Sequence, residues 1–532
     1  MTVIELPSWS LKEQIGQMVV VRAAGYLFDH QIGYPAWEAP AAKLRSWLQG
    51  LNLGGVILLG GSAAELAWRT QQLQSWAKTP LLIAADIEEG VGQRFSGATW
   101  FPPPMALGAI ATQNLDLAVN LAYQMGAVTA AEALAIGINW LLAPVVDVNN
   151  NPDNPVINVR AFGKTPAIVS KLATAFIAGA KLSPVLTTAK HFPGHGDTTV
   201  DSHLRLPIIP HSLERLETVE LPPFQQAIAA RVDSVMSAHL LIRAWDNIYP
   251  ATLSPSILTG QLRQKLGFEG LIVTDALIMG GVSNFASPAE LAVMAVEAGA
   301  DILLMPENPA VAIEAVEQAV HSGRLTAQRI KESVTRIWQA KLTLPCPFAG
   351  LGAASFLSEL ALPSARKTVA TILRSSLVTG GLLPIEPTGG RHLLLVDDVF
   401  NCDFLLQHTQ AVKFAQQLGY QVQLFDQQTL AFGLNDAQNT VLSVFLRGNP
   451  FRGTAGLTAQ TQENLKQLFQ TGLVTGLLVY GSPYVLDWLR SHLPSQFPWV
   501  FNYGQMPSAQ ALSWEILFGL SRFPNFQLEN FL

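Results

Sequence analysis

Residues 81–86 read LLIAAD, five apolar side chains followed directly by an aspartate. An uninterrupted apolar run of this kind is typical of a parallel strand that is buried on both faces of its sheet. The runs of this type are QMVVVRA (17–23), GVILLGG (55–61), LLIAAD (81–86), INWLLAP (138–144), VLTTAK (185–190), SVMSAH (234–239), LIVTDA (271–276) and ILLMPE (302–307). Helical stretches such as 114–135, 166–181 and 288–298 lie between them. The alternation predicts an α/β fold, a (β/α)8 TIM-like barrel. A doubly wound open sheet is the alternative, because periodicity does not establish closure.

A second series of strands follows a stretch rich in proline, glycine and serine at 345–365, which interrupts the alternation. Its apolar runs are HLLLVDD (392–398), VQLFD (422–426), TVLSVFL (440–446), GLLVYG (476–481) and WVFNYG (499–504). We expect a barrel domain over residues 1–345, a linker over 346–366 and a second, open α/β sheet domain over 367–532.

The composition excludes several classes of protein. The 532 residues include 33 Lys and Arg against 39 Asp and Glu, a formal charge of −6, without a basic run. Nucleic-acid binding is therefore not expected. The two cysteines, Cys346 and Cys402, are too few for a disulfide framework or a thiolate metal site. No stretch approaches the roughly 20 apolar residues of a membrane span. The N-terminus lacks the basic region of a secretory signal, so we expect a cytoplasmic protein without membrane partners.

Ionisable residues follow five of the eight predicted barrel strands. They are Asp86, Asp147, the pair Lys190 and His191, His239 and Asp275. In a parallel barrel all of these strand ends lie on one face, where such enzymes build their active sites. One aspartate after a strand could simply begin a turn. The combination of lysine, histidine and aspartate predicts a functional face.

The segment KHFPGHGDTTVDSH, residues 190–203, is the richest in reactive side chains. Pro193 and Gly194 make it a loop. No helix can therefore align His191 and His195 as i, i+4 zinc ligands. A loop could still gather metal ligands, and an ordinary polar surface loop is the other alternative. We expect no metal.

An acid–base function accounts better for the end of this segment. Asp201 and His203 are one residue apart, so in an extended segment their side chains point the same way. A carboxylate beside an imidazole fixes its tautomer and stabilises the imidazolium, which can then donate a proton near neutral pH. Asp275, the one ionisable group of LIVTDA, could be a nucleophile, a general base or a turn former. Its expected place opposite the loop favours the first two.

Further polar groups suit a polyhydroxylated ligand. The segment DIEEGVGQRF (86–95) contains Asp86 and Arg94, and NPVINVRAFG contains Arg160. Carboxylates accept hydrogen bonds from hydroxyl groups, and guanidinium groups donate to them.

At these residues the chain resembles glycoside hydrolase family 3, specifically the two-domain type of its β-N-acetylhexosaminidase (β-N-acetylglucosaminidase) branch. The specific match is KHFPGHGDTTVDSH. The supporting matches, in family order, are DIEEGVGQRF (86–95), NVRAFG (158–163), SVMSAH (234–239) and VTDALIMGG (273–281). VYGSPY (479–484) resembles the family's C-terminal α/β sandwich domain.

The resemblance implies a retaining mechanism without a metal or organic cofactor. Asp275 matches the nucleophile, His203 the acid/base and Asp201 its dyad partner. The positions that match sugar-binding residues are Asp86, Arg94, Arg160, Lys190 and His191.

The chain departs from the family pattern at two places. In the segment after the third strand the family usually has two glycines and a further basic residue, where this chain has Glu89 and Val91, which weakens the assignment of Asp86 and Arg94. Around Ala276 and Ile278 the family usually has a second acidic residue or a serine, which bears on how Asp275 is held.

The expected function is that of a monomeric exo-β-N-acetylglucosaminidase. It would remove terminal non-reducing GlcNAc from small saccharides through a covalent glycosyl–aspartate, and peptidoglycan turnover fragments are the expected substrates. A β-glucosidase or β-xylosidase of the family is one alternative, although it would normally take its acid/base from the second domain. A GlcNAc phosphorylase is another, because a histidine repels an incoming phosphate less than a carboxylate does. An inactive sugar-binding protein is the alternative outside catalysis.

Overall fold

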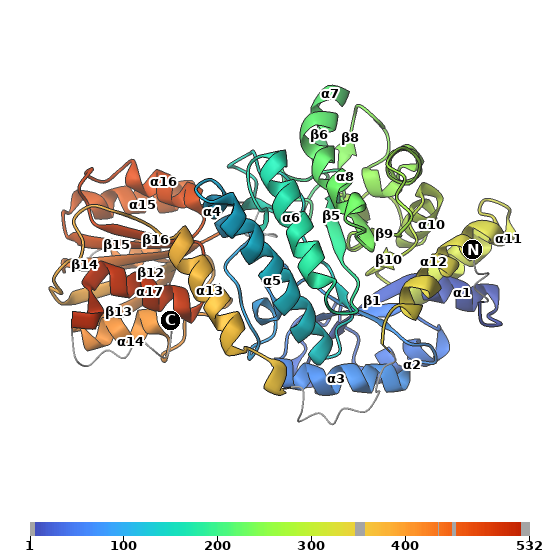
Figure 1. Ribbon diagram of the computed structural model, residues 1–532, viewed down its shortest axis with the longest axis horizontal. Coiled ribbons are helices and arrows are strands. Elements are labelled where there is room, and N and C mark those ends of the chain that lie inside the picture. The colour runs from blue at the N-terminus through green and yellow to red at the C-terminus, as the bar shows by residue number, and fades with distance from the viewer. Residues whose placement is uncertain (1–5, 346–356, 435, 449–453, 523–532) are drawn as a thin grey trace.

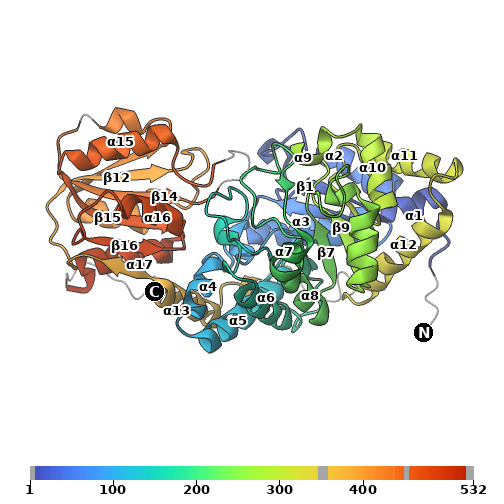
Figure 2. The same cartoon turned by 90° about the horizontal axis from the view of Figure 1, so that it is seen from above.

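The computed structural model describes residues 6–345, 357–434, 436–448 and 454–522. It consists of a barrel and a second α/β domain that lie side by side, with helix α13 (Pro363–Ser376) between them (Figures 1 and 2). Part of the expected linker, residues 346–356 with Cys346, lies outside the described residues. The boundaries at 345 and 367 stay predictions.

All eight predicted barrel strands are present. They are β1 (Val19–Ala24), β2 (Gly55–Leu59), β3 (Leu82–Ala85), β4 (Trp140–Leu141), β5 (Thr188–Phe192), β7 (Ser234–Ser237), β9 (Leu271–Thr274) and β10 (Leu303–Leu304). They form two parallel sheets, in the orders β10-β1-β2-β3-β4 and β5-β7-β9. Parallel bridges between Trp140 and Leu186 and between Val273 and Ile302 join the sheet edges. The ring is therefore closed, and the barrel is confirmed over the open sheet.

Helices surround the barrel (Figure 2). They are α1 (Leu11–Gln17), α2 (Ala41–Gly50), α3 (Ala63–Trp76), α4 (Met105–Ala111), α5 (Leu115–Ala135), α6 (Pro166–Ala180), α7 (Leu213–Arg215), α8 (Leu221–Ala229), the π-helix Ser256–Lys265, α9 (Gly280–Ser283), α10 (Pro288–Ala298), α11 (Pro309–His321) and α12 (Ala327–Leu342). Their starts follow from the sequence. Asn114 caps α5 by accepting from the N–H of Leu117, and Ser287 caps α10, whose first residue is proline.

The second domain is a six-stranded sheet with the order β11-β16-β15-β14-β12-β13. Its strands are β11 (Val378–Gly380), β12 (Gly390–Val396), β13 (Tyr420–Asp426), β14 (Thr440–Leu446), β15 (Val474–Gly481) and β16 (Trp499–Asn502). The five predicted strands are parallel, and β11 is an added antiparallel edge.

Helices cover both faces of this sheet (Figure 1). They are α14 (Gln410–Gln417), α15 (Ala459–Gln470), α16 (Pro483–Arg490) and α17 (Pro507–Phe518). Apolar residues of β14 alternate between the faces: Leu442 and Val444 pack with α15 and α16, whereas Val441 and Phe445 pack with α14 and α17. This is the expected α/β sandwich.

Two further features complete the fold. A small parallel pair, β6 (Ile208–Ile209) and β8 (Leu241–Ile242), lies outside the barrel ring and was not predicted, because two residues are too few to show a strand period. Among the helices that the structure describes, none combines the length and the apolar character that crossing a bilayer requires.

Candidate active site

Asp275 lies directly after β9, at the carboxyl end of the barrel. Its side-chain Oδ1 accepts from the N–H of Ala276 at 2.7 Å. Burial alone would raise the pKa of this carboxyl. Three imidazoles, those of His239, His191 and His203, outweigh burial and lower its pKa to about 2. The group is therefore an ionised carboxylate at neutral pH.

His239, just beyond β7, fixes the residue after Asp275. Its Nε2 lies 3.0 Å from the carbonyl oxygen of Ala276, and its Nδ1 lies 2.8 Å from the hydroxyl of Thr252. A carbonyl oxygen accepts only, so Nε2 carries a proton. Burial lowers the pKa of His239, which agrees with a neutral ring.

Asp201 and His203 are paired. Oδ1 of Asp201 accepts from the backbone N–H of His203 at 2.8 Å and lies 2.9 Å from its Nδ1. The aspartate side chain is 1% exposed and the histidine side chain 18% exposed. The expectation of an extended segment is wrong here: the N–H of Leu204 also bonds to the carbonyl of Asp201, so the backbone turns. The carboxylate reaches the ring by capping this turn.

The turn that carries this pair is docked against the chain beyond Asp275. The N–H of Gly280 donates to the carbonyl of His203, and the N–H of Gly281 donates to that of Ser202, both at 2.9 Å. A β-carbon would lie 2.8 Å from the first carbonyl oxygen at position 280 and 2.6 Å from the second at position 281. Only glycine permits this approach, which brings the carboxylate and the dyad to one place.

His195 stabilises the loop between β5 and the Asp201–His203 turn through two side-chain hydrogen bonds. Its Nε2 is 2.8 Å from the hydroxyl of Ser202, and its Nδ1 is 2.9 Å from that of Thr198. Burial lowers its pKa to about 4. Both ring nitrogens are thus occupied by hydroxyl groups. Over the described part of the chain, no group of three or more His, Cys, Asp or Glu side chains is arranged to hold a metal ion.

Ion pairs join three of the five predicted sugar-binding residues, and a hydrogen bond adds Arg94. Lys190 Nζ is 2.6 Å from Oδ1 of Asp86 and 3.6 Å from Oε2 of Glu88. Arg160 Nε is 2.7 Å from the other oxygen of Glu88, and Arg94 donates to the backbone carbonyl of Asp86 at 3.2 Å. Lys190 is buried, whereas the side chain of Asp86 is 27% exposed. The set therefore gathers charged donors and acceptors at the carboxyl ends of β3 and β5.

His191 completes the predicted set through a different partner. Its Nδ1 is 2.8 Å from Asp147, which also accepts from the backbone N–H groups of His191 and His195. The loop predicted over residues 190–203 begins only after Phe192, so Lys190 and His191 belong to the strand whose end they were expected to mark. Both lie inside β5, because the pairing with β7 continues to Phe192.

Family models match most of the chain. Residues 10–340 match the glycosyl hydrolase family 3 N-terminal domain, and residues 386–519 match the bacterial glycosyl hydrolase family 3 C-terminal domain. The chain belongs to glycosyl hydrolase family 3.

Curated relatives of family 3 are similar over long segments. Beta-hexosaminidase A of Pseudoalteromonas piscicida is 35% identical over 403 residues, 69% of this chain and 66% of the relative. A beta-N-acetylglucosaminidase/beta-glucosidase of Cellulomonas fimi is 31% identical over 367 residues, 66% of this chain and 64% of the relative. The chain therefore spans somewhat less than two thirds of the length of both relatives.

Solved structures extend the likeness to the whole chain. The family 3 β-N-acetylglucosaminidase from Paenibacillus sp. str. FPU-7 is 30% identical, with a TM-score of 0.79 and coverage of 96% of this chain and 97% of that one. A beta-glucoside phosphorylase has a TM-score of 0.80 and covers 96% of this chain and 92% of that one, and at 24% identity this likeness concerns the fold alone.

Glu88 is a residue of this family 3 site that the sequence does not distinguish from its acidic neighbours. It is buried, and burial would raise its pKa, but Lys190, Arg160 and Arg94 hold the pKa well below its usual range. The sequence offers one signal, the two adjacent glutamates of DIEEG. If either is buried, its carboxylate needs cations from elsewhere in the barrel. Asp147, in contrast, is recognisable in the sequence only as a strand end.

The second domain also reaches the site, and sequence reasoning could not show this. Arg447, directly after β14, forms an ion pair with Glu89. Asn149 donates to the hydroxyl of Tyr484 in α16 at 2.9 Å. Glu89 is one of the two departures from the family pattern in the segment after β3, and its partner is 358 residues away in the chain.

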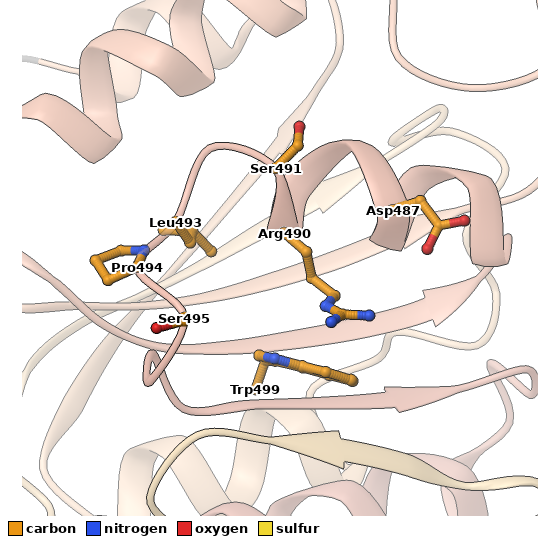
Figure 3. Close-up of a pocket in the computed structure, with 7 residues that line it drawn as sticks. All are labelled: Asp487, Arg490, Ser491, Leu493, Pro494, Ser495 and Trp499. Atoms are coloured by element: carbon orange, nitrogen blue, oxygen red, sulfur yellow. The ribbon is translucent and has the colours of Figure 1, made fainter.

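A separate hollow on the second domain is lined by none of these residues. Figure 3 shows its lining: Asp487, Arg490, Ser491, Leu493, Pro494, Ser495 and Trp499. The guanidinium of Arg490 lies 4.7 Å from the centre of the Trp499 ring. It covers the face on which a sugar ring would stack, and the hollow contains none of the predicted site residues.

Proposed function

We propose that this chain is a retaining exo-β-N-acetylglucosaminidase that releases a terminal non-reducing GlcNAc from small saccharides. The observation that carries the proposal is the docking of the Asp201–His203 turn against the glycines that follow Asp275. It supports a nucleophile and an acid/base acting on one glycosidic bond. The names of the family 3 relatives support the sugar.

The proposed reaction has two steps. Asp275 attacks the anomeric carbon while the bond to the leaving oxygen breaks and His203 donates its proton to that oxygen. A water molecule then attacks the glycosyl–aspartate, His203 takes the water's proton, and Asp275 is released. Asp201 on Nδ1 makes Nε2 the nitrogen that exchanges the proton and stabilises the imidazolium. Two displacements give net retention.

The test is release of nitrophenol from the aryl β-GlcNAc glycoside by the wild type, Asp275→Ala and His203→Ala. Asp275→Ala should be inactive, and azide should restore turnover with an α-glycosyl azide as product. His203→Ala should lose less, because nitrophenol needs little protonation, and azide should give the β-azide. Asp233→Asn is the matched control. Asp233 directly precedes β7, so it lies at the amino-terminal end of a barrel strand, whereas Asp275 lies at the carboxyl end.

The same assay separates the alternatives. Turnover of glucose or xylose glycosides without turnover of GlcNAc glycosides would refute the substrate class. Formation of a sugar 1-phosphate in phosphate buffer would identify a phosphorylase. Binding of GlcNAc without turnover of any aryl glycoside would identify a sugar-binding protein.

Peptidoglycan fragments as natural substrates, a cytoplasmic place of action, a monomeric state and independence from cofactors are further parts of the proposal. They are tested by product analysis on purified fragments, cell fractionation, light scattering and activity after chelation.

A further inference from the structure

Two neighbouring residues of the second domain contact the barrel on either side of the ion pair between Glu88 and Arg160. Arg447 and Gly448 are consecutive residues after β14. Arg447 pairs with Glu89, the neighbour of Glu88. A β-carbon at Gly448 would lie 2.8 Å from the carbonyl oxygen of Pro155 and 3.0 Å from Cβ of Asn158.

Glu88 and Arg160 form the ion pair that lies between these two contacts. Asn158 begins the short 3₁₀-helix Asn158–Arg160, so Gly448 packs at the start of the turn that ends in Arg160. Residues of one loop therefore hold the backbone that carries the carboxylate and the backbone that carries the guanidinium.

The carboxylate that pairs with Arg447, that of Glu89, is fully buried. Glu89 is 0% exposed and accepts from the indole N–H of Trp100 at 3.1 Å as well as from both terminal nitrogens of Arg447. Its backbone carbonyl accepts from the N–H of Phe101 at 2.7 Å. Burial would lower the pKa of the Arg447 guanidinium, but the charge of Glu89 raises it. A carboxylate this deeply buried needs its cation, because an unpaired buried charge is strongly destabilising.

We propose that Arg447 and Gly448 are positioning residues of the second domain. They hold the barrel's Glu88–Arg160 and Glu88–Lys190 ion pairs in the positions that bind the sugar. The proposal rests on the proposed sugar-binding function of Arg160 and Lys190. Arg447 acts through Glu89, and Gly448 acts through the turn at 155–158. Neither residue exchanges a proton or touches a reacting atom.

The experiment compares full-length Arg447→Ala, Arg447→Lys, Glu89→Gln and Gly448→Ala. Each is assayed with the nitrophenyl β-GlcNAc glycoside and with chitobiose, whose leaving group needs protonation. Loss of a charge-assisted hydrogen-bonded pair predicts a fall in kcat/KM of about ten- to a hundredfold for Arg447→Ala. The factor should be the same for both substrates, because positioning does not depend on the leaving group. Arg447→Lys should restore part of it.

Two controls isolate the contact. Arg490→Ala removes an arginine of the same domain that lies over Trp499 (Figure 3), and Thr368→Val removes a hydrogen bond from α13 to Gln124 of the barrel. Both should stay within about twofold of the wild type. If Arg447→Ala does not differ from these controls, the proposal is wrong.

A double mutant tests whether Arg447 acts through Glu89. Arg447→Ala combined with Glu89→Gln should be no worse than the more damaged single variant, since both break one pair. Losses that multiply would mean that Arg447 acts independently of Glu89 and would overturn the proposal.

Hydrogen exchange gives a readout that does not depend on turnover. Arg447→Ala should speed exchange in residues 86–101, with no change in the sheet of the second domain. Faster exchange throughout the second domain would show a merely structural function. If the wild type neither binds nor cleaves GlcNAc while exchange in 86–101 responds as predicted, the sugar assignment fails and the domain coupling stands.

Discussion

Two histidines of the segment 190–203, His191 and His203, each pair with an aspartate, and the two pairs differ in setting more than in geometry. His191 Nδ1 is 2.8 Å from Asp147, and His203 Nδ1 is 2.9 Å from Asp201. His191 lies in β5 with 7% of its side chain exposed, whereas His203 lies on a turn with 18% exposed. Asp147 also accepts two backbone N–H groups, one of them from the following loop.

A carboxylate beside an imidazole therefore does not by itself identify an acid/base catalyst. The pair on the strand is fixed by the barrel and lies next to Lys190, so it suits binding of the substrate. The pair on the turn is held by main-chain bonds to the loop after Asp275, so it suits exchange of a proton. Four experiments test this difference between the two pairs.

The largest effect should come from His203→Ala on chitobiose. Loss of general acid catalysis predicts a fall in kcat of about 10²–10⁴-fold, because the leaving oxygen then departs without a proton. The fall should be much smaller with nitrophenol as leaving group. The matched control is His211→Ala: this histidine also faces an aspartate, Asp197, at 3.0 Å and is 20% exposed. An equal loss in the control would remove the distinction.

Asp201→Asn should have the next largest effect, about ten- to a hundredfold in kcat/KM. The amide can still cap the turn but no longer stabilises the imidazolium, so the alkaline limb of the pH–rate profile should move to lower pH. The acid limb above pH 4 should not arise from Asp275, whose pKa of about 2 keeps it ionised there. An unchanged alkaline limb in Asp201→Asn would argue against the dyad.

His191→Ala should reduce kcat/KM by about tenfold, with the same factor for chitobiose and the aryl glycoside. The strand pair concerns binding, so the loss should not depend on the leaving group. A loss confined to chitobiose would mean that His191, and not His203, supplies the proton.

The smallest effect on activity should come from His195, which links the two pairs. The unfolded chain takes up a proton at this ring near pH 6.5 and the folded chain only near pH 4. Between these values the unfolded state binds more protons, so the free energy of unfolding falls as the pH falls, by up to about 3 kcal/mol. Urea unfolding at pH 7 and pH 5 should show a smaller difference in His195→Gln than in the wild type or His211→Ala. An equal difference would show that His195 does not titrate in this window.

Sequence reasoning predicted the parts of this molecule that local pattern determines. The eight buried strands are visible as apolar runs. The spacing of Asp201 and His203 placed them close together, but the pair forms by capping a turn and not along an extended segment. The end of β5 was misplaced because Lys190 and His191 are polar yet continue the ladder to β7, where other barrel residues neutralise them.

The contribution of the second domain could not be predicted from the sequence. Arg447 follows an ordinary buried strand, and nothing in TVLSVFLRG indicates that the strand ends against a barrel loop. The departure at Glu89 could be seen in the sequence, but its explanation is a contact between residues 358 positions apart. Such a contact depends on how the two domains dock.

The glycine pair at 280 and 281 makes the docked turn readable in other sequences. Because a methyl group at either position would meet a carbonyl oxygen of residue 203 or 202, the docked position of the turn requires both glycines. A relative that keeps the aspartate–histidine pair but has larger side chains after its nucleophile has to hold that turn away from the barrel. Two small residues therefore predict, from sequence alone, whether a family 3 chain can dock this turn as it is docked here.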